Sequence, residues 1–251
     1  MLHGQHALIT GGGTGIGLAI AQALAAQGAQ VTITGRRLPV LVEAATATPG
    51  LHALQMDVTD EASVTEGIAA AIAARGPVTI CVPNAGIAEG RALHKMDMDF
   101  WRRMMAINLD GAFLTLRECL PGMRAAGWGR IVAVASVAGL RGLKGAPAYT
   151  ASKHGLVGLV RGLSEDLAGT GITCNALCPA YVDTEIVTRN TASIAQRAGI
   201  AEDDALRLML SANRHGRLVT VDEVAAAALW LCGPGSGSVN GQTIEIAGGQ
   251  A

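Results

Sequence analysis

The sequence predicts an α/β protein built around a doubly wound parallel sheet with helices on both faces. Two observations carry this prediction. Short apolar strand patterns alternate with Ala-rich helical patterns along most of the chain, and the first strand runs into a glycine-rich turn at residues 10–17. Regular alternation produces parallel strands joined by right-handed crossovers. Because the 251 residues show no repeat and no interdomain linker, we expect one domain over residues 1–251.

The elements follow from the hydrophobic period of each segment. We expect strands at residues 6–10, 30–34, 52–56, 78–82, 129–136, 172–177 and 243–246. We expect helices at residues 18–27, 61–74, 152–168 and 221–232, and a long helix over 98–126 that is bent or broken near 108–111. Ligands of such sheets bind beyond the carboxyl ends of the strands, so the segments that follow the strands should border one crevice.

The stretch 183–217 interrupts the alternation. It shows no strand pattern and consists of one or two amphipathic helices of mixed charge. An insertion of this length after a strand end favours a lid over a substrate pocket, and a plain pair of surface helices is the alternative.

Composition and charge argue against several classes of protein. The chain is 50% apolar and 16% charged with a formal net charge of −1, so nothing indicates nucleic-acid binding. No apolar run reaches the length of a membrane span, and the N-terminal residues lack the pattern of a signal peptide. We therefore expect a cytoplasmic protein. The five scattered cysteines predict neither a disulfide framework nor a metal site.

The glycine-rich turn indicates nucleotide binding. Gly11, Gly15 and Gly17 stand between a strand and a helix, where backbone N–H groups and the helix dipole favour a phosphate. The second strand ends at Arg36 and Arg37, and no acid lies between residues 31 and 41. An acid there would bind a ribose 2′-OH, whereas arginine accommodates a 2′-phosphate. We therefore expect NADP(H) in preference to NAD(H), with a solvated turn as the alternative.

Tyr149 and Lys153 stand four residues apart, which places them on one face of a helix. A lysine ammonium near a phenol lowers the pKa of the phenol, which can then exchange a proton with a carbonyl or an alcohol. Such pairs are also common on helix surfaces, so the neighbours decide. Ser136, at a strand end, supplies a second hydroxyl for the same oxygen, although a serine there often only caps the next turn.

Taken together, these motifs resemble the short-chain dehydrogenase/reductase family over nearly the whole chain. The residues that match in order and spacing are Thr10, Gly11, Gly15, Gly17, Asp57, Asn84, Ala85, Gly86, Asn108, Ser136, Tyr149, Lys153, Pro179 and Thr184, followed by the tail at 240–249. The resemblance implies a Rossmann-like fold. It also implies an NAD(P)(H)-dependent oxidoreductase that interconverts a secondary alcohol and a ketone by hydride transfer.

The resemblance further implies a catalytic role for each of four residues. Tyr149 would exchange the proton with the substrate oxygen, and Ser136 would hydrogen-bond that oxygen. Lys153 would hold the nicotinamide ribose and lower the pKa of Tyr149, and Asn108 would support a water that relays protons to Lys153. The cofactor-binding set that it implies is Gly11, Thr14, Gly15, Ile16, Gly17, Arg36, Arg37, Asp57, Val58, Asn84, Ala85, Gly86, Tyr149, Lys153, Pro179, Val182 and Thr184.

Two positions depart from the family's pattern. Pro83 stands where the family usually has Asn, and Ala180 where it usually has Gly. Proline removes a backbone donor and fixes φ. Both departures bear on the local geometry of the cofactor, and neither touches the reacting groups.

The substrate and the partners stay open at this stage. The 183–217 stretch resembles lids of family members that act on hydroxy acids, hydroxyacyl thioesters and cyclic ketones, so the candidates are β-keto/hydroxyacyl compounds and aromatic or cyclic ketones. Arg141, Lys144 and Tyr181 are candidates to face the pocket. Arg141 or Lys144 could pair with a carboxylate or a CoA phosphate, with a solvated loop as the alternative. A catalytically silent dinucleotide-binding regulatory or scaffold protein is the alternative from another class.

The resemblance also suggests a homodimer or homotetramer. Gly155, Gly158 and Gly162 in the helix expected at 152–168 would allow close approach by another helix, and a second contact is expected at about 101–123. Packing of these glycines inside one subunit is the alternative.

Overall fold

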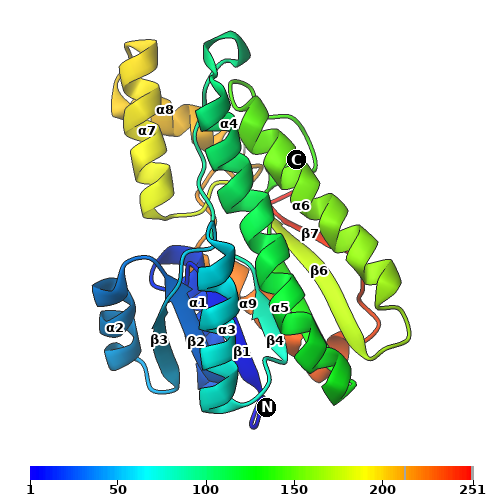
Figure 1. Ribbon diagram of the computed structural model, residues 1–251. Coiled ribbons are helices and arrows are strands. Elements are labelled where there is room, and N and C mark those ends of the chain that lie inside the picture. The colour runs from blue at the N-terminus through cyan, green and yellow to red at the C-terminus, as the bar shows by residue number, and fades with distance from the viewer. Residues whose placement is uncertain (212, 250–251) are drawn as a thin grey trace.

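A parallel sheet of seven strands, in the order β3-β2-β1-β4-β5-β6-β7, forms the centre of the computed structural model (Figure 1), which describes residues 1–211 and 213–249. The strand order reverses between β1 and β4, since β1 pairs with both β2 and β4. The strands are β1 (His6–Thr10), β2 (Gln30–Gly35), β3 (Leu51–Gln55), β4 (Ile80–Val82), β5 (Gly129–Val134), β6 (Ile172–Pro179) and β7 (Thr243–Ile246). The predicted doubly wound sheet is confirmed.

Helices cover both faces of this sheet, with α3, α5 and α6 in front of it and α1 and α9 behind it in Figure 1. The helices are α1 (Gly15–Ala26), α2 (Leu38–Ala47), α3 (Glu61–Arg75), α4 (Met98–Met105), α5 (Gly111–Ala126), α6 (Pro147–Asp166), α7 (Glu185–Ala198), α8 (Glu202–Leu210) and α9 (Val221–Cys232). Short 3-10 turns occupy Leu93–Lys95, Val137–Gly139 and Pro234–Ser236. Within the described residues, no helix combines the length and the apolar character that crossing a membrane requires.

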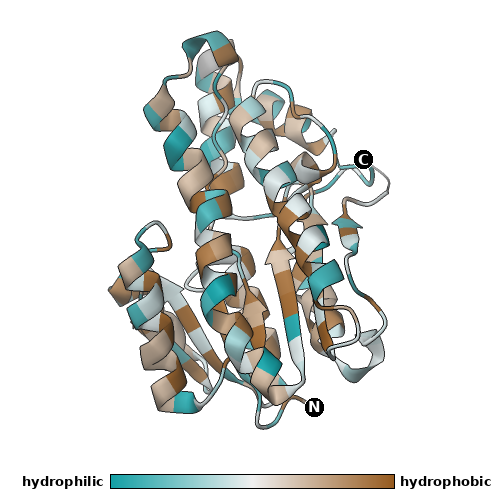
Figure 2. Cartoon of the chain, turned by 45° about the vertical axis from the view of Figure 1, so that its right-hand side comes forward, coloured by the Kyte–Doolittle hydropathy of each residue, from teal (hydrophilic) through white to brown (hydrophobic). Residues whose placement is uncertain are grey.

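Each face of the sheet has its own hydrophobic core. Leu8 packs into the cluster under α3, α5 and α6, whereas its neighbours Ala7 and Ile9 pack into the cluster under α1 and α9. Successive side chains of a strand point to opposite faces, so a strand covered on both sides must be apolar throughout. Every residue of β1 and β5 is buried. Figure 2 shows the consequence as hydrophobic strands flanked by helices whose outer surfaces are more polar.

Two helices show the largest differences from the sequence prediction. Helix α2 was not expected, because Val40, Val42 and Thr46 are β-branched and weaken the helical pattern. Burial of Leu41 and Ala44 against the sheet stabilises it. Helix α6 begins five residues earlier than expected, because its first turn contains a proline whose fixed φ suits a helix start.

The long helix expected at 98–126 is confirmed, and its irregularity falls where the bend was expected. Helix α4 continues through a π-helical segment, Ala106–Asp110, into α5. A π-helical turn inserts extra backbone into a helix and is often found at functional sites. Here the segment carries Asn108. The stretch 183–217 contains α7 and α8, as expected, and its function as a lid stays a prediction.

Candidate active site

A cavity of ≈ 950 Å³ opens at the carboxyl ends of the strands, where the sequence places the crevice. It brings together segments that follow β1 to β6. Seventeen of the predicted site residues line it, namely Gly11, Thr14, Gly15, Ile16, Arg36, Arg37, Asp57, Val58, Asn84, Ala85, Gly86, Ser136, Tyr149, Lys153, Pro179, Val182 and Thr184. Gly17 and Asn108 are not among the lining residues and lie behind the wall.

The glycine-rich turn has the backbone shape that a phosphate site needs. Gly11 and Gly15 have φ of +64° and +54°, a region that side chains disfavour. A Cβ on Gly17 would collide with the Asn84 amide and the Gly11 carbonyl, so Gly17 permits close packing of α1 against the turn. The open N-terminus of α1 therefore faces the cavity, and the residues present fit a pyrophosphate.

Asn84 and Thr10 fix this turn to the end of β4. The Thr10 hydroxyl accepts hydrogen bonds from the backbone N–H groups of Asn84 and Ala85, each at 3.0 Å. The Asn84 amide donates to the carbonyl oxygens of Thr10 at 2.9 Å and Gly11 at 3.1 Å. The Pro83 carbonyl still accepts from Val134 N–H at 2.9 Å, so the unusual proline keeps its link to β5. The Asn84 amide thus positions the turn.

The far end of the cavity carries the two adjacent arginines. Arg36 and Arg37 are exposed, and within the described residues neither forms an ion pair. Gln55 Nε2 donates to the Arg36 carbonyl at 3.0 Å and anchors the backbone there. The Asp57 carboxylate accepts from the backbone and hydroxyl of Thr59 at 2.9 and 2.8 Å. Two unpaired cations at this end suit a phosphate on the ribose.

Ser136, Tyr149 and Lys153 meet where β5 ends and α6 begins. Because α6 starts at Pro147, Tyr149 lies in its first turn and Lys153 one turn later. Lys153 is 4% exposed, and its Nζ donates to the Val134 carbonyl at 2.9 Å and lies 6.0 Å from the Tyr149 ring centroid. The Ser136 hydroxyl hydrogen-bonds the Tyr149 phenol and also accepts from Ala138 N–H at 3.1 Å. Ser136 therefore caps the following turn and contacts the phenol as well.

The electrostatics of this corner differ from the sequence expectation. Burial raises the pKa of Tyr149, and the hydrogen bond with Ser136 opposes that rise. Burial also lowers the pKa of Lys153 to about 8, with the Cys178 thiol acting in the opposite direction. The expected lowering of the Tyr149 pKa by Lys153 is not found. The physical reason is that loss of water around the phenolate outweighs the attraction of an ammonium that donates to Val134.

Asn108 lies beside this corner and ties two segments together. Its Oδ1 accepts from Ile87 N–H at 2.8 Å, and its Nδ2 donates to the Ile87 carbonyl at 2.9 Å and to Ser152 Oγ at 3.0 Å. A Cβ added to Gly86 would lie 3.2 Å from Asn108 Oδ1 and 3.6 Å from Lys153 Nζ. Asn108 is thus adjacent to Lys153, as expected, while its side chain is engaged with the loop after β4. Its support of a relay water stays a prediction.

Two further residues, Cys178 and Tyr181, lie near this corner. The sequence made Tyr181 a candidate pocket residue and gave Cys178 no role. Cys178 is buried next to Ser136. Burial raises the pKa of the Cys178 thiol to about 11, and the backbone N–H of Ser136 acts in the opposite direction. Tyr181 lines the cavity, and burial raises the pKa of its phenol while Arg141 lowers it. The position of both at the carboxyl end of β6 was the available signal. Lys144 lines the cavity, whereas Arg141 is near enough to lower the pKa of Tyr181 but is not among the lining residues. No cluster of potential metal ligands occurs within the described part of the chain.

Comparison with known proteins agrees with this geometry. The family model for short chain dehydrogenases matches residues 5–195. D-beta-hydroxybutyrate dehydrogenase of Cupriavidus necator is 38% identical over 254 residues, which cover 99% of this chain and 98% of that protein. A putative ketoacyl reductase of granaticin polyketide synthase from Streptomyces violaceoruber is 36% identical, covering 97% and 92%.

A solved structure shows the same agreement in three dimensions. The crystal structure of an actinorhodin polyketide ketoreductase variant with NADPH superposes with a TM-score of 0.94 at 32% identity, covering 99% of this chain and 98% of that one. The chain therefore belongs to the short-chain dehydrogenase/reductase family of NAD(P)(H)-dependent oxidoreductases, which interconvert alcohols and ketones.

Proposed function

We propose that this enzyme interconverts a β-ketoacyl compound and the corresponding β-hydroxyacyl alcohol, with NADP(H) as the preferred cofactor. The observation that carries the proposal is the meeting of the Ser136 and Tyr149 hydroxyls beside Lys153, in the same cavity as the glycine-rich turn. The similarity to a hydroxybutyrate dehydrogenase and to ketoacyl reductases supports this substrate class over aromatic and cyclic ketones.

Different groups of lining residues would bind different parts of the cofactor. The turn at Gly11–Gly17 would hold the pyrophosphate, Arg36 and Arg37 the 2′-phosphate, Asp57 and Val58 the adenine, Asn84–Gly86 the adenine ribose, Lys153 the nicotinamide ribose, and Pro179, Val182 and Thr184 the carboxamide. A nicotinamide bound there supplies the hydride. Lys153 uses one of its three N–H donors on Val134 within the described residues, which leaves donors for a ribose.

The proton of the reaction would be transferred by the side chains of Tyr149, Ser136 and Lys153. With its pKa raised, Tyr149 is protonated at neutral pH and can donate its O–H proton to the oxygen of a ketone as that oxygen gains charge. Ser136 contacts the phenol, so its hydroxyl can hydrogen-bond the same oxygen. Lys153, with a pKa of about 8, is largely protonated at neutral pH and can return a proton to Tyr149.

The decisive experiment is Tyr149→Phe, assayed with a β-ketoacyl thioester and NADPH. We expect a loss of turnover of roughly 10²–10⁴-fold, the usual contribution of a placed proton donor, with NADPH affinity retained. Full activity in Tyr149→Phe would contradict the proposal. Binding of NADPH without turnover of any ketone or alcohol by the wild type would instead favour a catalytically silent binder.

The cofactor preference has its own test. The ratio of kcat/KM for NADPH to that for NADH should exceed one in the wild type and fall in Arg36→Ala, because the guanidinium would pair with the 2′-phosphate, which NADH lacks. Equal or better use of NADH by the wild type would refute the preference.

We further propose a homodimer or homotetramer in the cytoplasm. Gly158 and Gly162 on α6 are exposed, and a Cβ there would meet nothing within 4 Å, whereas Gly155 packs inside the subunit against Leu109. Phe113 on α5 is 47% exposed, which supports a contact between copies at this face. Five buried free cysteines suit a reducing compartment. Light scattering of the wild type and of Gly158→Arg would test the interface, since a charged side chain there should dissociate the copies.

A further inference from the structure

One wall of the cavity extends far beyond the corner formed by Ser136, Tyr149 and Lys153, which we call the catalytic corner. Ile186, Asn190, Ile194 and Ala198 of α7 all line it. They are spaced four residues apart, so they form one ridge along a single face of the helix. At 1.5 Å of rise per residue, the ridge is about 18 Å long. Three of its four members are apolar. Met209 of α8 also lines the cavity, and its side chain is buried.

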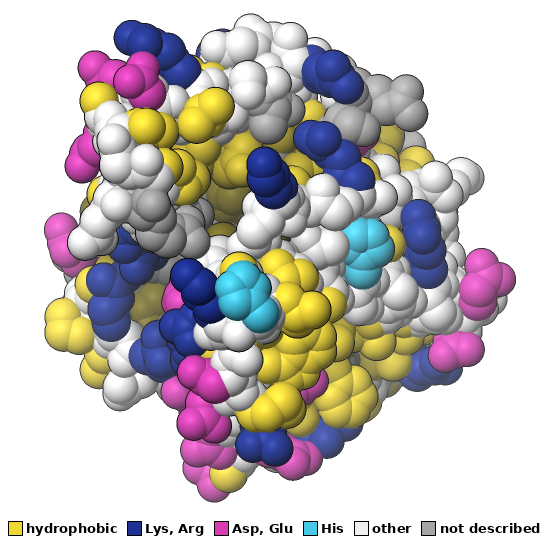
Figure 3. Space-filling view, turned by 90° about the horizontal axis from the view of Figure 1, so that it is seen from above, with side chains coloured by type: hydrophobic (Ala, Val, Ile, Leu, Met, Phe, Trp, Pro, Cys, Tyr) yellow, Lys and Arg dark blue, Asp and Glu magenta, His cyan; other side chains and the backbone are white. Residues whose placement is uncertain are grey.

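The facing wall is also largely apolar. It consists of Ile87 and Ala88 from the loop after β4, and of Leu143 and Ala146 from the loop before α6. Seen from above, the molecule has a hollow with hydrophobic side chains on its walls and lysine and arginine side chains near its edge (Figure 3). The space beside the ridge is thus continuous with the catalytic corner and is suited to an apolar group.

The charges in this part of the cavity lie at its rim or are already paired. Lys144, Glu185 and Arg189 line the cavity but are exposed. The Glu89 carboxylate accepts two hydrogen bonds from the Arg103 guanidinium, each at 2.8 Å, which holds the pKa of Glu89 below its ordinary value. A small charged substrate would therefore leave the ridge in contact with water, which is unfavourable for its apolar side chains.

We infer that the substrate carries a long alkyl chain on its β-oxo group, and that this chain lies along the ridge formed by Ile186, Asn190, Ile194 and Ala198. The inference rests on the proposed function and adds the length of the acyl chain to it. The β-oxo oxygen is placed at Ser136 and Tyr149, and the alkyl chain runs away from them between α7 and the loop at 87–90. A four-carbon substrate would use only the first turn of α7.

The test is a series of N-acetylcysteamine thioesters of acetoacetate, β-ketooctanoate and β-ketododecanoate, assayed with NADPH and with NADH. We expect kcat/KM to rise along the series by up to roughly fourfold for each methylene that becomes buried. A flat or falling profile from acetoacetate to β-ketododecanoate would overturn the inference and leave the proposed function standing. No turnover of any member with either cofactor would overturn the proposed function instead.

A matched pair of variants tests the position of the chain. Ala198→Trp fills the far end of the ridge, so the ratio of kcat/KM for β-ketododecanoyl to that for acetoacetyl thioester should fall at least tenfold. Ala192→Trp adds the same side chain on an exposed face of α7 that does not line the cavity, and should keep the wild-type ratio. An unchanged ratio in Ala198→Trp would overturn the placement along α7.

A second substitution covers the case in which the added tryptophan disturbs folding. Ile194→Ser removes apolar surface without adding bulk, and the same ratio should again fall. If the ratio in Ile194→Ser equals that of the wild type, the ridge does not contact the substrate.

Discussion

The cavity has two parts that are held in place by different means. We call the part lined by residues 11–16, 34–37, 56–58 and 84–86 the cofactor half, and the part lined by α7 and α8 the substrate half. In the cofactor half, the walls are backbone segments that leave buried strands directly, and hydrogen bonds from Thr10 and Asn84 fix the turn after β1. In the substrate half, the wall is α7, which packs against α8 and stands away from the sheet (Figure 1). Rigid placement suits a ligand that is common to a whole family, whereas a separate helical wall allows specificity to vary without changing the sheet.

The substrate half is joined to the sheet at one base. Asn213 is 1% exposed, and its Oδ1 accepts from Tyr181 N–H at 3.1 Å. Its Nδ2 donates to the carbonyls of Tyr181 at 2.9 Å and Arg217 at 2.7 Å. The chain therefore leaves the sheet and returns to it at the same point. We propose that this base lets α7 and α8 act together as the lid that the sequence predicts.

Among the changes considered, removal of the Asn84 side chain should have the largest effect on NADPH binding in the cofactor half. In Asn84→Ala the turn loses two hydrogen bonds of about 1 kcal/mol each, so the Kd for NADPH should rise roughly 30-fold. The KM for the ketone at saturating NADPH should change little. Titration of protein fluorescence with NADPH measures the first effect. Thr10→Ser retains the accepting hydroxyl and should bind NADPH nearly as the wild type does; an equal loss in both variants would contradict this account of the turn.

Lys153, which lies between the two halves, should control the pH dependence of ketone reduction. Burial lowers the pKa of Lys153 to about 8. In the proposed mechanism the Lys153 ammonium returns the proton to Tyr149. As pH rises through about 8 the amine becomes neutral, so kcat/KM for reduction should fall, approaching tenfold per pH unit. In Lys153→Arg, whose guanidinium stays charged, this alkaline limb should vanish. A limb that persists unchanged in Lys153→Arg would assign the ionisation to another group.

The substrate half should respond more mildly to a change at its base. Asn213→Ala removes three hydrogen bonds, but the bridge between Val182 and Val219 and the 2.9 Å hydrogen bond from Asp183 N–H to the Val219 carbonyl remain. The KM for the ketone should therefore rise only about fivefold, while the Kd for NADPH is preserved. Ser211→Ala, at an exposed position of the same segment, serves as the control. Equal changes in KM and in NADPH affinity would mean that the halves are not separable.

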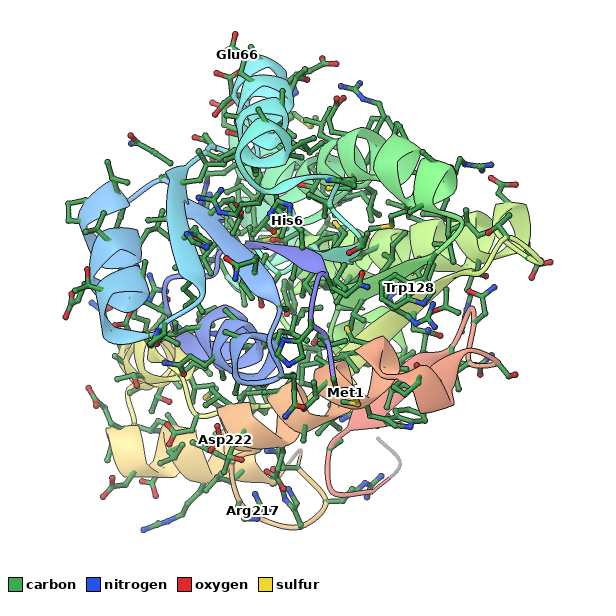
Figure 4. The ribbon with its side chains drawn as sticks, turned by 90° about the horizontal axis from the view of Figure 1, so that it is seen from below. Met1, His6, Glu66, Trp128, Arg217 and Asp222 are labelled. Atoms are coloured by element: carbon green, nitrogen blue, oxygen red, sulfur yellow. The ribbon has the colours of Figure 1, made fainter. Side chains whose placement is uncertain are left out.

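A region outside both halves should affect stability alone. His6 is the first residue of the central strand β1 and is buried (Figure 4). Its ring nitrogens lie 2.8 Å from the Gly76 carbonyl oxygen and 2.8 Å from the Thr32 hydroxyl. Burial lowers the pKa of its imidazole, so the folded chain binds a proton less readily than the unfolded chain. As the pH falls through the unfolded pKa of about 6.5, the unfolded chain binds a proton before the folded chain does, so stability decreases as the pH falls.

The expected loss at His6 is roughly 1 kcal/mol between pH 7.5 and 5.5, measured by urea unfolding. His6→Asn cannot titrate and should show a smaller difference between the two pH values. A larger pH-dependent loss in His6→Asn than in the wild type would rule out His6 as the cause.

The cofactor half was largely predictable because its signals are local. A glycine that permits a left-handed turn, such as Gly11 or Gly15, and a strand that must be apolar on both faces are properties of short segments. The bend near Asn108 was predictable for the same reason. Helix α2 was not, because its stability comes from Leu41 and Ala44 packing against β3, a contact that no local pattern contains.

The sequence by itself determined the order of the strands and of the helices other than α2, the turn that suits a pyrophosphate, and the spacing of Tyr149 and Lys153. Only the tertiary structure decided that Lys153 donates to Val134, that the pKa of Tyr149 rises, and that Lys144 lines the cavity whereas Arg141 does not. It also decided that Ile186, Asn190, Ile194 and Ala198 face the catalytic corner's own cavity. The physical reason is that spacing along the chain sets which side chains share a face, whereas burial and the distances between elements depend on how the whole chain packs.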